Sequence, residues 1–174
     1  MKVFFIRHGE SEYNVKNLVN QDPKVIVGLT KRGIKQAEEV AEKFKDEKFD
    51  VIFVSELERT KRTAEIINKS NIKVIADYRI NEVMSKYEGE STKIPDELLR
   101  RSMGEKVKGV ESVREIVKRV SKFLDDLKEE DYSNVLVVSH EAVLMAVFII
   151  INGLSDKKFF DKRFGNCEIL EIEI

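Results

Sequence analysis

Short apolar segments recur along the chain and predict the strands of a β-sheet. They are residues 3–6 (VFFI), 51–54 (VIFV), 72–76 (IKVIA) and 135–138 (VLVV). Three of the four are apolar at every position, so both faces of those strands are hydrophobic. Strands of this kind are typical of a parallel sheet that is covered on both sides. The last residues, 167–174, predict a final strand at an edge of the sheet.

Helical patterns lie between these segments. After Thr30, which suits a helix N-cap, apolar residues recur every three or four positions. Residues 57–67 predict a second helix. Residues 112–128 predict the clearest one, because a capping box, S-x-x-E, stands at its start. Residues 142–151 are apolar throughout, but a transmembrane helix needs about 20 such residues, so this segment predicts a buried helix.

Strands that alternate with helices indicate an α/β fold. We therefore expect a three-layer sandwich, with a mostly parallel central sheet, helices on both faces and the C-terminal strand at an edge. The length of 174 residues suits one domain over residues 1–174. Residues 78–108 have weak periodicity and contain Gly89, Pro95 and Gly104, which predicts a short lid-like excursion over one end of the sheet.

The charge balance limits the range of partners. Charged residues make up 36% of the chain, yet 31 Lys and Arg stand against 32 Asp and Glu, for a net charge of -1. This balance excludes strongly basic nucleic-acid-binding proteins, and we expect neither nucleic acid nor a membrane as a partner. The single cysteine and the short N-terminal apolar run favour a cytoplasmic protein. Abundant Lys and Glu with few Gly and Pro resemble the composition of thermophile proteins.

The chain has only two histidines, and each follows a predicted strand by one residue. His8 stands beside Arg7 after the first strand, and His140 follows the strand at 135–138. Arg59 comes shortly after the strand at 51–54. Because the carboxyl ends of parallel strands meet at one edge of a sheet, we expect these side chains to lie together there. Guanidinium groups bind phosphate through paired hydrogen bonds, and imidazole acts as nucleophile or donor, so the combination suits phosphate chemistry.

The same residues carry a resemblance to a known family. Residues 7–14 (RHGESEYN) resemble the signature R-H-G-x-S/T-x-x-N of the histidine phosphatase superfamily, which includes the phosphoglycerate mutases. Further matches follow in order along nearly the whole chain. They are L-T-x-x-G-x-x-Q-A at 29–37, S-x-L-x-R-T-x-x-T-A at 55–64, G-V-E-S at 109–112, S-H at 139–140 and N-C at 166–167.

The resemblance implies a role for each matching residue. His8 is expected to be the nucleophile that becomes a phosphohistidine, inside a phosphate pocket formed by Arg7, Arg59 and His140. The two nearby guanidinium charges favour the neutral form of His8 that attack requires. Glu82 is expected to protonate the leaving group and then, as a carboxylate, to activate water. No metal or cofactor is implied.

Three further positions belong to the expected site. Asn14 is expected to give a hydrogen bond to a phosphate oxygen, and Glu88 is the alternative proton donor. Glu141 stands where the family commonly has glycine. A carboxylate at this position is able to pair with a pocket cation or to clash with a substrate phosphate. We favour a third interpretation, a first-turn acid that the helix dipole stabilises.

These observations predict a phosphatase that hydrolyses a small phosphorylated metabolite, as a monomer or a homodimer. Within the family, the alternative is a phosphoglycerate mutase that depends on a phosphorylated cofactor. Such an enzyme would need a grip for a second anionic group, and basic residues in or beside 78–108 are candidates. They are Lys86, Lys93, Arg100, Arg101, Lys106 and Lys108. The alternatives of another class are a metal-dependent hydrolase, whose ion His8, His140 and acidic residues would hold, and a non-catalytic module that binds phosphorylated ligands.

Overall fold

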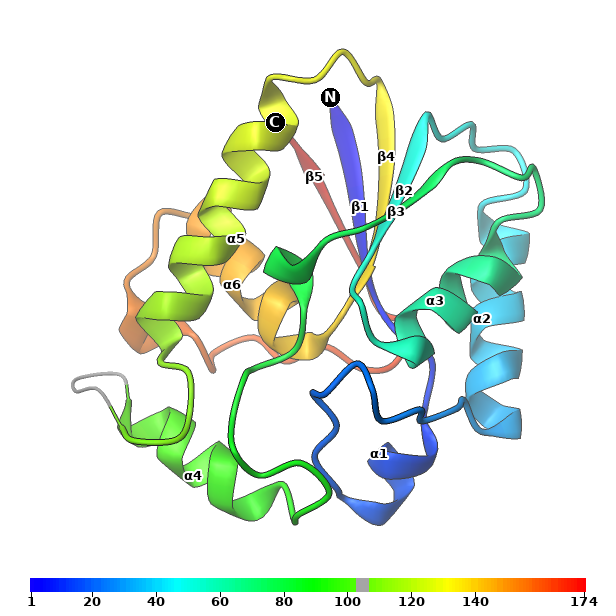
Figure 1. Cartoon of the computed structure of the whole chain (residues 1–174). Coiled ribbons are helices and arrows are strands. Elements are labelled where there is room, and N and C mark those ends of the chain that lie inside the picture. The colour runs from blue at the N-terminus through cyan, green and yellow to red at the C-terminus, as the bar shows by residue number, and fades with distance from the viewer. Residues whose placement is uncertain (103–106) are drawn as a thin grey trace.

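A sheet of five strands forms the centre of the computed structural model, which describes residues 1–102 and 107–174 (Figure 1). The strand order is β3-β2-β4-β1-β5. The strands are β1 (Lys2–Arg7), β2 (Val51–Val54), β3 (Val74–Ala76), β4 (Asn134–Ser139) and β5 (Ile169–Glu173). The first four run parallel, and β5 pairs antiparallel with β1 at an edge. The predicted α/β sandwich with an edge strand at its C-terminus is therefore confirmed.

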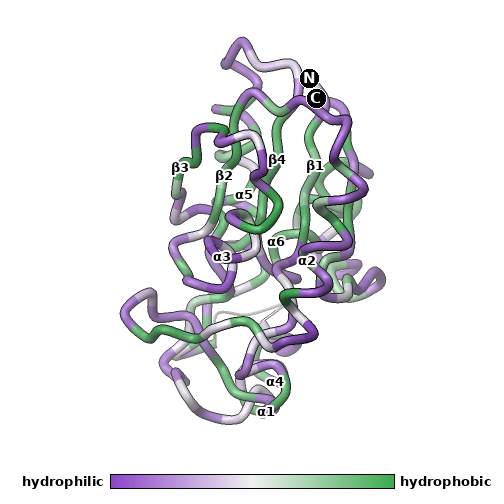
Figure 2. The backbone as a smooth tube through the Cα atoms, turned by 90° about the vertical axis from the view of Figure 1, so that its right-hand side faces the viewer, coloured by the Kyte–Doolittle hydropathy of each residue, from purple (hydrophilic) through white to green (hydrophobic). Residues whose placement is uncertain are grey.

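The central strands are apolar on both faces because helices cover both. Val3 and Phe5 of β1 pack with α5 (Val113–Lys128) and α6 (Glu141–Ile151). Phe4 and Ile6 point to the opposite face, into a second core. There they pack with α2 (Lys31–Lys43) and α3 (Glu58–Ile67). Figure 2 shows the hydrophobic colour concentrated in these strands, with polar residues along the outer helices.

Local signals set where the helices begin. The Thr30 side chain accepts a hydrogen bond from Gly33 N at the start of α2, and Ser112 and Glu115 form the predicted capping box of α5. The final strand begins at residue 169 rather than 167. Cys167 has a φ of 57° and donates its backbone N–H to Arg7 O, which places it outside the ladder of β5. Among the described residues, no helix is both long and apolar enough to cross a membrane.

The segment from 78 to 108 has more structure than its weak periodicity indicates. It contains a 3-10 turn, η1 (Tyr78–Ile80), and a helix, α4 (Lys93–Arg101). Pro95 lies near the start of α4, where a missing N–H is tolerated. A short helix, α1 (Glu12–Lys16), and a second 3-10 turn, η2 (Asp156–Lys158), were also not predicted. Both α1 and α4 lie beyond the carboxyl ends of β1 and β4 (Figures 1 and 2).

Candidate active site

The two histidines and Arg59 meet at the carboxyl edge of the sheet, as the sequence predicts. His8 follows β1, Arg59 lies in the first turn of α3 and His140 is the N-cap of α6. The two imidazole rings lie 5.2 Å apart between centroids. Arg59 connects them, because its Nε donates to His8 Nε2 at 2.9 Å and its Nη2 to His140 Nδ1 at 3.1 Å. All three residues are no more than 4% exposed.

The hydrogen bonds of His8 fix its tautomer. Nδ1 lies 2.7 Å from Gly9 O, and because a carbonyl oxygen only accepts, Nδ1 carries the hydrogen. Nε2 therefore keeps its lone pair. Burial, followed by the charges of Arg59 and Arg7, lowers the pKa of His8 well below its ordinary value, so the ring is neutral at pH 7. A neutral imidazole is the form that acts as a nucleophile, and in the absence of substrate its Nε2 lone pair accepts the hydrogen bond from Arg59 Nε.

Close backbone packing holds the loop that follows His8. A side chain at Gly9 would place its Cβ 2.5 Å from Gly33 O, and one at Gly33 would lie 2.0 Å from Glu10 O. The family motif at 29–37 thus supplies Gly33, which packs against the backbone of the loop after His8. Gly9 N also donates to Thr63 Oγ1 of α3 at 3.1 Å. These contacts fix the His8 backbone against two helices.

Arg59 is held in place by Asn20, a residue that the sequence did not single out. Its Nη1 donates to Asn20 Oδ1 and its Nη2 to Asn20 O at 3.0 Å. Burial lowers the pKa of Arg59 to about 10, so the group stays charged at neutral pH. The side chain of Asn20 is oriented in turn by Glu88, whose Oε1 accepts from Asn20 Nδ2 at 3.2 Å.

Glu88 does not line the cavity of the site, although the sequence offered it as an alternative proton donor. Its second oxygen accepts from the backbone N–H groups of Gln21, at 2.7 Å, and Asp22, at 2.9 Å. The carboxylate therefore fastens the loop that carries Asn20. The sequence around Glu88 gives no sign of this role, because its partner Asn20 lies 68 residues away.

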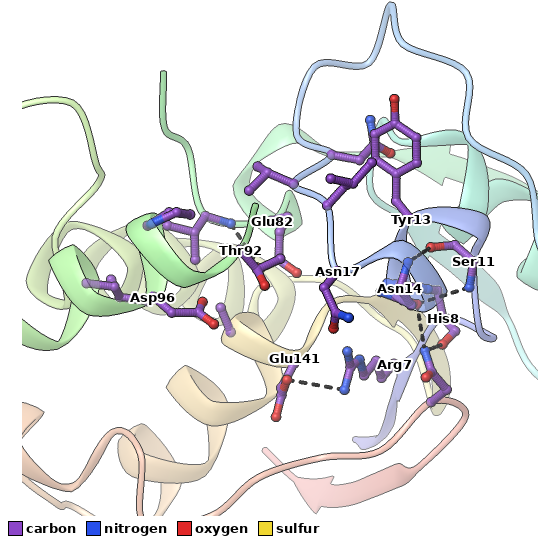
Figure 3. Close-up of a pocket in the computed structure, with 18 of the residues that line it drawn as sticks. Arg7, His8, Ser11, Tyr13, Asn14, Asn17, Glu82, Thr92, Asp96 and Glu141 are labelled. Atoms are coloured by element: carbon purple, nitrogen blue, oxygen red, sulfur yellow. Dashed lines mark hydrogen bonds and ion pairs between the residues drawn. The ribbon is translucent and has the colours of Figure 1, made fainter. Parts of the chain in front are cut away.

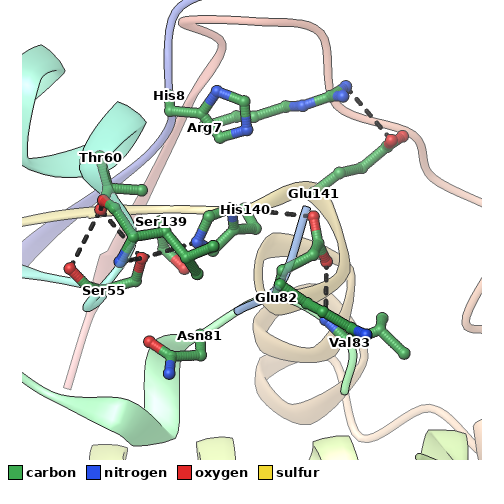
Figure 4. A network of polar contacts seen from close by, with 12 residues as sticks. Arg7, His8, Ser55, Thr60, Asn81, Glu82, Val83, Ser139, His140 and Glu141 are labelled. Carbon is green, nitrogen blue, oxygen red and sulfur yellow. Dashed lines mark hydrogen bonds and ion pairs between the residues drawn. The ribbon is translucent and has the colours of Figure 1, made fainter. Parts of the chain in front are cut away.

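His140 occupies the inner wall of the site, behind Arg59. Because Nη2 of Arg59 only donates, His140 Nδ1 accepts, and Nε2 donates to Ser55 Oγ at 2.7 Å (Figure 4). Burial, followed by the charge of Arg59, lowers the pKa of His140 well below its ordinary value. Ser55 was not assigned a role, although it is the first residue after β2, just as the histidines follow their strands closely.

Glu82 reaches the same place from the other side, after η1. Its Oε2 lies 3.7 Å from His140 Nδ1, and its Oε1 accepts from Val83 N at 3.0 Å (Figure 4). Burial raises the pKa of Glu82 above its ordinary value, although the Arg59 charge opposes the shift. A carboxyl group that holds its proton more tightly suits a general acid.

Arg7 has a donor with no partner. Its Nη1 donates to Phe164 O at 2.6 Å, whereas its Nε is the one buried side-chain nitrogen or oxygen without a hydrogen bond among the described residues. A buried guanidinium N–H costs free energy when it is left unpaired. Because Arg7 lines the cavity, this donor is suited to an anion that enters it.

Glu141 is not the benign first-turn acid that we favoured. It lies in the first turn of α6, but its carboxylate pairs with a cation of the pocket, at 3.2 Å from Arg7 Nη1 (Figure 3). Arg163 binds the same carboxylate through two nitrogens, at 2.5 and 3.1 Å. Glu141 thus connects Arg7 to the loop before β5. The local sequence gives no sign of this contact, because Arg163 lies 22 residues away.

Asn14 lines the cavity with its amide fixed. Its Oδ1 accepts from Ser11 N at 3.0 Å and from Asn166 Nδ2 at 3.2 Å, so its own Nδ2 remains available as a donor. Asn166 also donates to His8 O at 3.0 Å, which explains the N-C motif near the C-terminus. In this way the last loop of the described chain supports the nucleophile's backbone.

The cavity that these residues line measures about 450 Å³ and extends from His8 toward α4 (Figure 3). Of the six basic residues considered for a second anionic group, Arg100 lines this cavity, and Lys106 lies outside the described residues. Within the described ranges, no group of three or more His, Cys, Asp or Glu side chains is arranged to hold a metal ion.

The fold and the site together define an α/β enzyme in which an uncharged histidine faces two guanidinium groups and a carboxylic acid. Comparison with known proteins identifies the class. The model of the histidine phosphatase superfamily (branch 1) matches residues 3–174, and the chain belongs to this family. The resemblance of the sequence motifs is therefore confirmed.

Individual relatives agree. Phosphoserine phosphatase 1 of Hydrogenobacter thermophilus is 31% identical, over 96% of this chain and 83% of its own length. A protein of Proteus mirabilis named probable phosphoglycerate mutase GpmB is 30% identical, over 99% and 85%. The crystal structure of the α-ribazole phosphatase of Shigella flexneri has a TM-score of 0.88 at 26% identity and covers 100% of this chain and 91% of that one. Phosphatases thus stand among the relatives in both sequence and structure, which supports a phosphoric monoester hydrolase.

Proposed function

We propose that this protein hydrolyses phosphomonoesters of small metabolites through a phosphohistidine formed on Nε2 of His8, without a metal or another cofactor. The observation that carries the proposal is the pairing of a neutral imidazole lone pair with the unpartnered N–H of Arg7 at one cavity. Relatives named after phosphoserine and phosphoglycerate support a small phosphorylated substrate. The single cysteine of the chain favours a cytoplasmic setting.

Substrate binding uses the donors that surround His8. Arg7 gives its free Nε–H to the phosphate and Asn14 adds its Nδ2. Arg59 donates its Nε–H to His8 Nε2 before substrate binds, and this N–H passes to a phosphate oxygen when His8 Nε2 attacks phosphorus. His140 forms the inner wall of this pocket. A phosphate dianion beside it favours the protonated ring, which then donates from Nδ1. Charge spread over the phosphate oxygens is neutralised by groups that are already in position.

The first chemical step transfers the phosphoryl group to the enzyme. The lone pair of His8 Nε2 forms the N–P bond while the bond from phosphorus to the leaving oxygen breaks. Glu82 gives its proton to that oxygen, so the product leaves as a neutral alcohol. The raised pKa of Glu82 keeps this proton available to a higher pH than an exposed glutamate would.

The second step releases phosphate. The Glu82 carboxylate accepts a proton from water as the water oxygen attacks phosphorus, and the N–P bond breaks. Inorganic phosphate leaves, His8 is again neutral and Glu82 again carries a proton. The same two side chains therefore act in both steps, and no further proton donor is needed.

The test is a panel of phosphomonoesters in the presence of a chelator. We expect steady phosphate release by the native protein and a loss of roughly 10³-fold or more in His8→Ala. Arg101→Ala is the matched control, because Arg101 lies at the surface and pairs with Glu97. Phosphate release by His8→Ala at the native rate would overturn the proposal. Activity that a chelator abolishes would instead indicate a metal-dependent hydrolase, and efficient isomerisation of phosphoglycerate would indicate a mutase.

A further inference from the structure

The cavity continues past the phosphate pocket to a wall formed by α4. Two charged residues of this helix, Asp96 and Arg100, stand one helical turn apart and both line the cavity. In Figure 3, Asp96 projects from α4 toward the space between Glu82 and Glu141. His8 lines the same cavity, so a phosphomonoester bound at His8 has this wall within the space open to its leaving group.

Arg100 is held by stacking alone. Its guanidinium carbon lies 4.2 Å from the centroid of the Phe160 ring, and it makes no hydrogen bond or ion pair with any described residue. Stacking fixes the plane of the group and leaves the N–H edges free for a planar anion. The other two arginines nearby are engaged, because Arg163 binds Glu141 and Arg101 binds Glu97.

The carboxylate of Asp96 also has no ion pair or hydrogen bond within the described part of the chain. Opposite charges at positions i and i+4 of a helix commonly pair, yet Asp96 and Arg100 do not. Burial and the negative charge of Glu141 raise the pKa of Asp96, whereas the charges of Arg163 and Arg100 lower it. Counting only residues 1–102 and 107–174, the wall thus presents one anion and one cation without a partner, one helical turn apart.

We infer that this wall binds the ammonium and carboxylate groups of an amino acid, and that the preferred substrates are O-phosphorylated amino acids such as phosphoserine. Asp96 takes the ammonium group and Arg100 takes the carboxylate. Apolar side chains, Pro95, Leu99 and Met145, line the rest of this part of the cavity and suit a short carbon skeleton. The inference rests on the proposed function, since it names the substrate class of the same site.

Four phosphomonoesters separate the two contacts. Phosphoserine carries both groups, phosphoethanolamine only the ammonium, 3-phosphoglycerate only the carboxylate and glycerol 3-phosphate neither. We expect kcat/KM of the native protein to be highest for phosphoserine. In Arg100→Gln, the ratio of kcat/KM for phosphoserine to that for phosphoethanolamine should fall roughly 10- to 100-fold, the range expected for a lost charge-assisted hydrogen bond.

Asp96→Asn tests the other contact. It should lower the ratio of kcat/KM for phosphoserine to that for 3-phosphoglycerate by a similar roughly 10- to 100-fold. Arg101→Gln, on the same helix but outside the cavity, is the matched control and should leave both ratios as they are. The inference is wrong if Arg100→Gln and Asp96→Asn leave these ratios of kcat/KM unchanged. It is also wrong if each substitution lowers kcat/KM for all four substrates by the same factor.

A failure of this inference is distinguishable from a failure of the proposed function. Hydrolysis of p-nitrophenyl phosphate that requires His8, with no preference among the four metabolites, would overturn the inference on substrate class alone. Hydrolysis that is independent of His8 would overturn the proposed function itself, whatever the preference.

Discussion

The contact between Asn20 and Glu88 offers a sharp test of how the phosphate pocket is held. Asn20 accepts from Arg59 with its Oδ1 and donates to Glu88 with its Nδ2, at 3.2 Å. Glu88→Gln turns an amide NH₂ toward the NH₂ of Asn20, so two donors oppose each other. Asn20→Asp places two carboxylates face to face instead. Each single substitution therefore breaks the contact between the two side chains and leaves the volume of the side chain unchanged. Asn20→Asp also loses the 3.3 Å hydrogen bond from Nδ2 to Val25 O.

The cost of each single substitution follows from the bonds that change. Glu88→Gln loses one charge-assisted hydrogen bond and converts the two to Gln21 N and Asp22 N into neutral ones. Together these changes should lower the free energy of unfolding by about 2 to 4 kcal/mol. Asn20→Asp should cost about 2 kcal/mol at pH 7, with relief in acid, because two close carboxylates share a proton. If the amide of Asn20 turns away, Arg59 loses an acceptor, and kcat/KM should fall about tenfold.

The double variant, Asn20→Asp with Glu88→Gln, restores the contact with its direction reversed. The introduced glutamine would donate from Nε2 to the introduced aspartate, while its oxygen still accepts from the two backbone N–H groups. The other oxygen of the introduced aspartate still accepts from Arg59. We expect a favourable coupling free energy of about 2 kcal/mol between the substitutions, and recovery of most of kcat/KM.

The assay combines urea unfolding with measurement of kcat/KM for p-nitrophenyl phosphate. The leaving group of this substrate has no ammonium or carboxylate group, so kcat/KM does not depend on charged contacts with Asp96 and Arg100. The reasoning is refuted if both single variants keep kcat/KM within about twofold of native while losing stability. It is also refuted if the losses in the double variant simply add.

Other predictions concern residues on either side of this contact. Because only the protonated acid donates, kcat/KM for glycerol 3-phosphate should fall as pH rises through the raised pKa of Glu82. Glu82→Gln should remove this fall from the pH profile. If the fall persists in Glu82→Gln, another group is responsible for it. Glu141→Gln removes the negative charge 3.2 Å from Arg7 and should tighten inhibition by inorganic phosphate several-fold, whereas an unchanged inhibition constant would contradict the pairing. Gly33→Ala places a Cβ 2.0 Å from Glu10 O and should lower the free energy of unfolding by about 2 kcal/mol or more. Gly28→Ala is the control, because its Cβ would have no atom within 4 Å, and it should change the free energy of unfolding little. Equal urea midpoints for the two variants would refute the packing argument.

The helices and strands predicted from the sequence are those that bury many apolar residues at regular spacing. The strands at 3–6 and 135–138 lie in the middle of the sheet, where both faces are covered, so their patterns are unambiguous. Helix α4 does carry a helical apolar pattern, with Ile94 and Leu98 four residues apart and Pro95 and Leu99 likewise. The pattern covers only six residues and contains a proline, so it did not predict a helix from the sequence alone.

The same division holds for the site. His8, Arg59 and His140 follow strands that end at one edge, so topology alone brings them together. Asn20 lies in a loop without periodicity, and it acquires its role from Arg59, which lies 39 residues later, and from Glu88. Glu141 was judged from its place in the first turn of a helix, although its contact with Arg7 arises from the fold. Pairings of this kind are set by tertiary structure and are not visible in a single sequence.

The central claim is that His8 carries the phosphoryl group between the two steps. Rapid quenching of the reaction with a ³²P-labelled phosphomonoester tests it most directly. The account predicts a label that is stable in alkali and labile in acid, located on the peptide that contains His8 and absent from His8→Ala. With p-nitrophenyl phosphate, whose leaving group needs no proton, the labelled enzyme should accumulate further in Glu82→Gln. Turnover by the native protein without any such label, or the same label on His8→Ala, would contradict the mechanism.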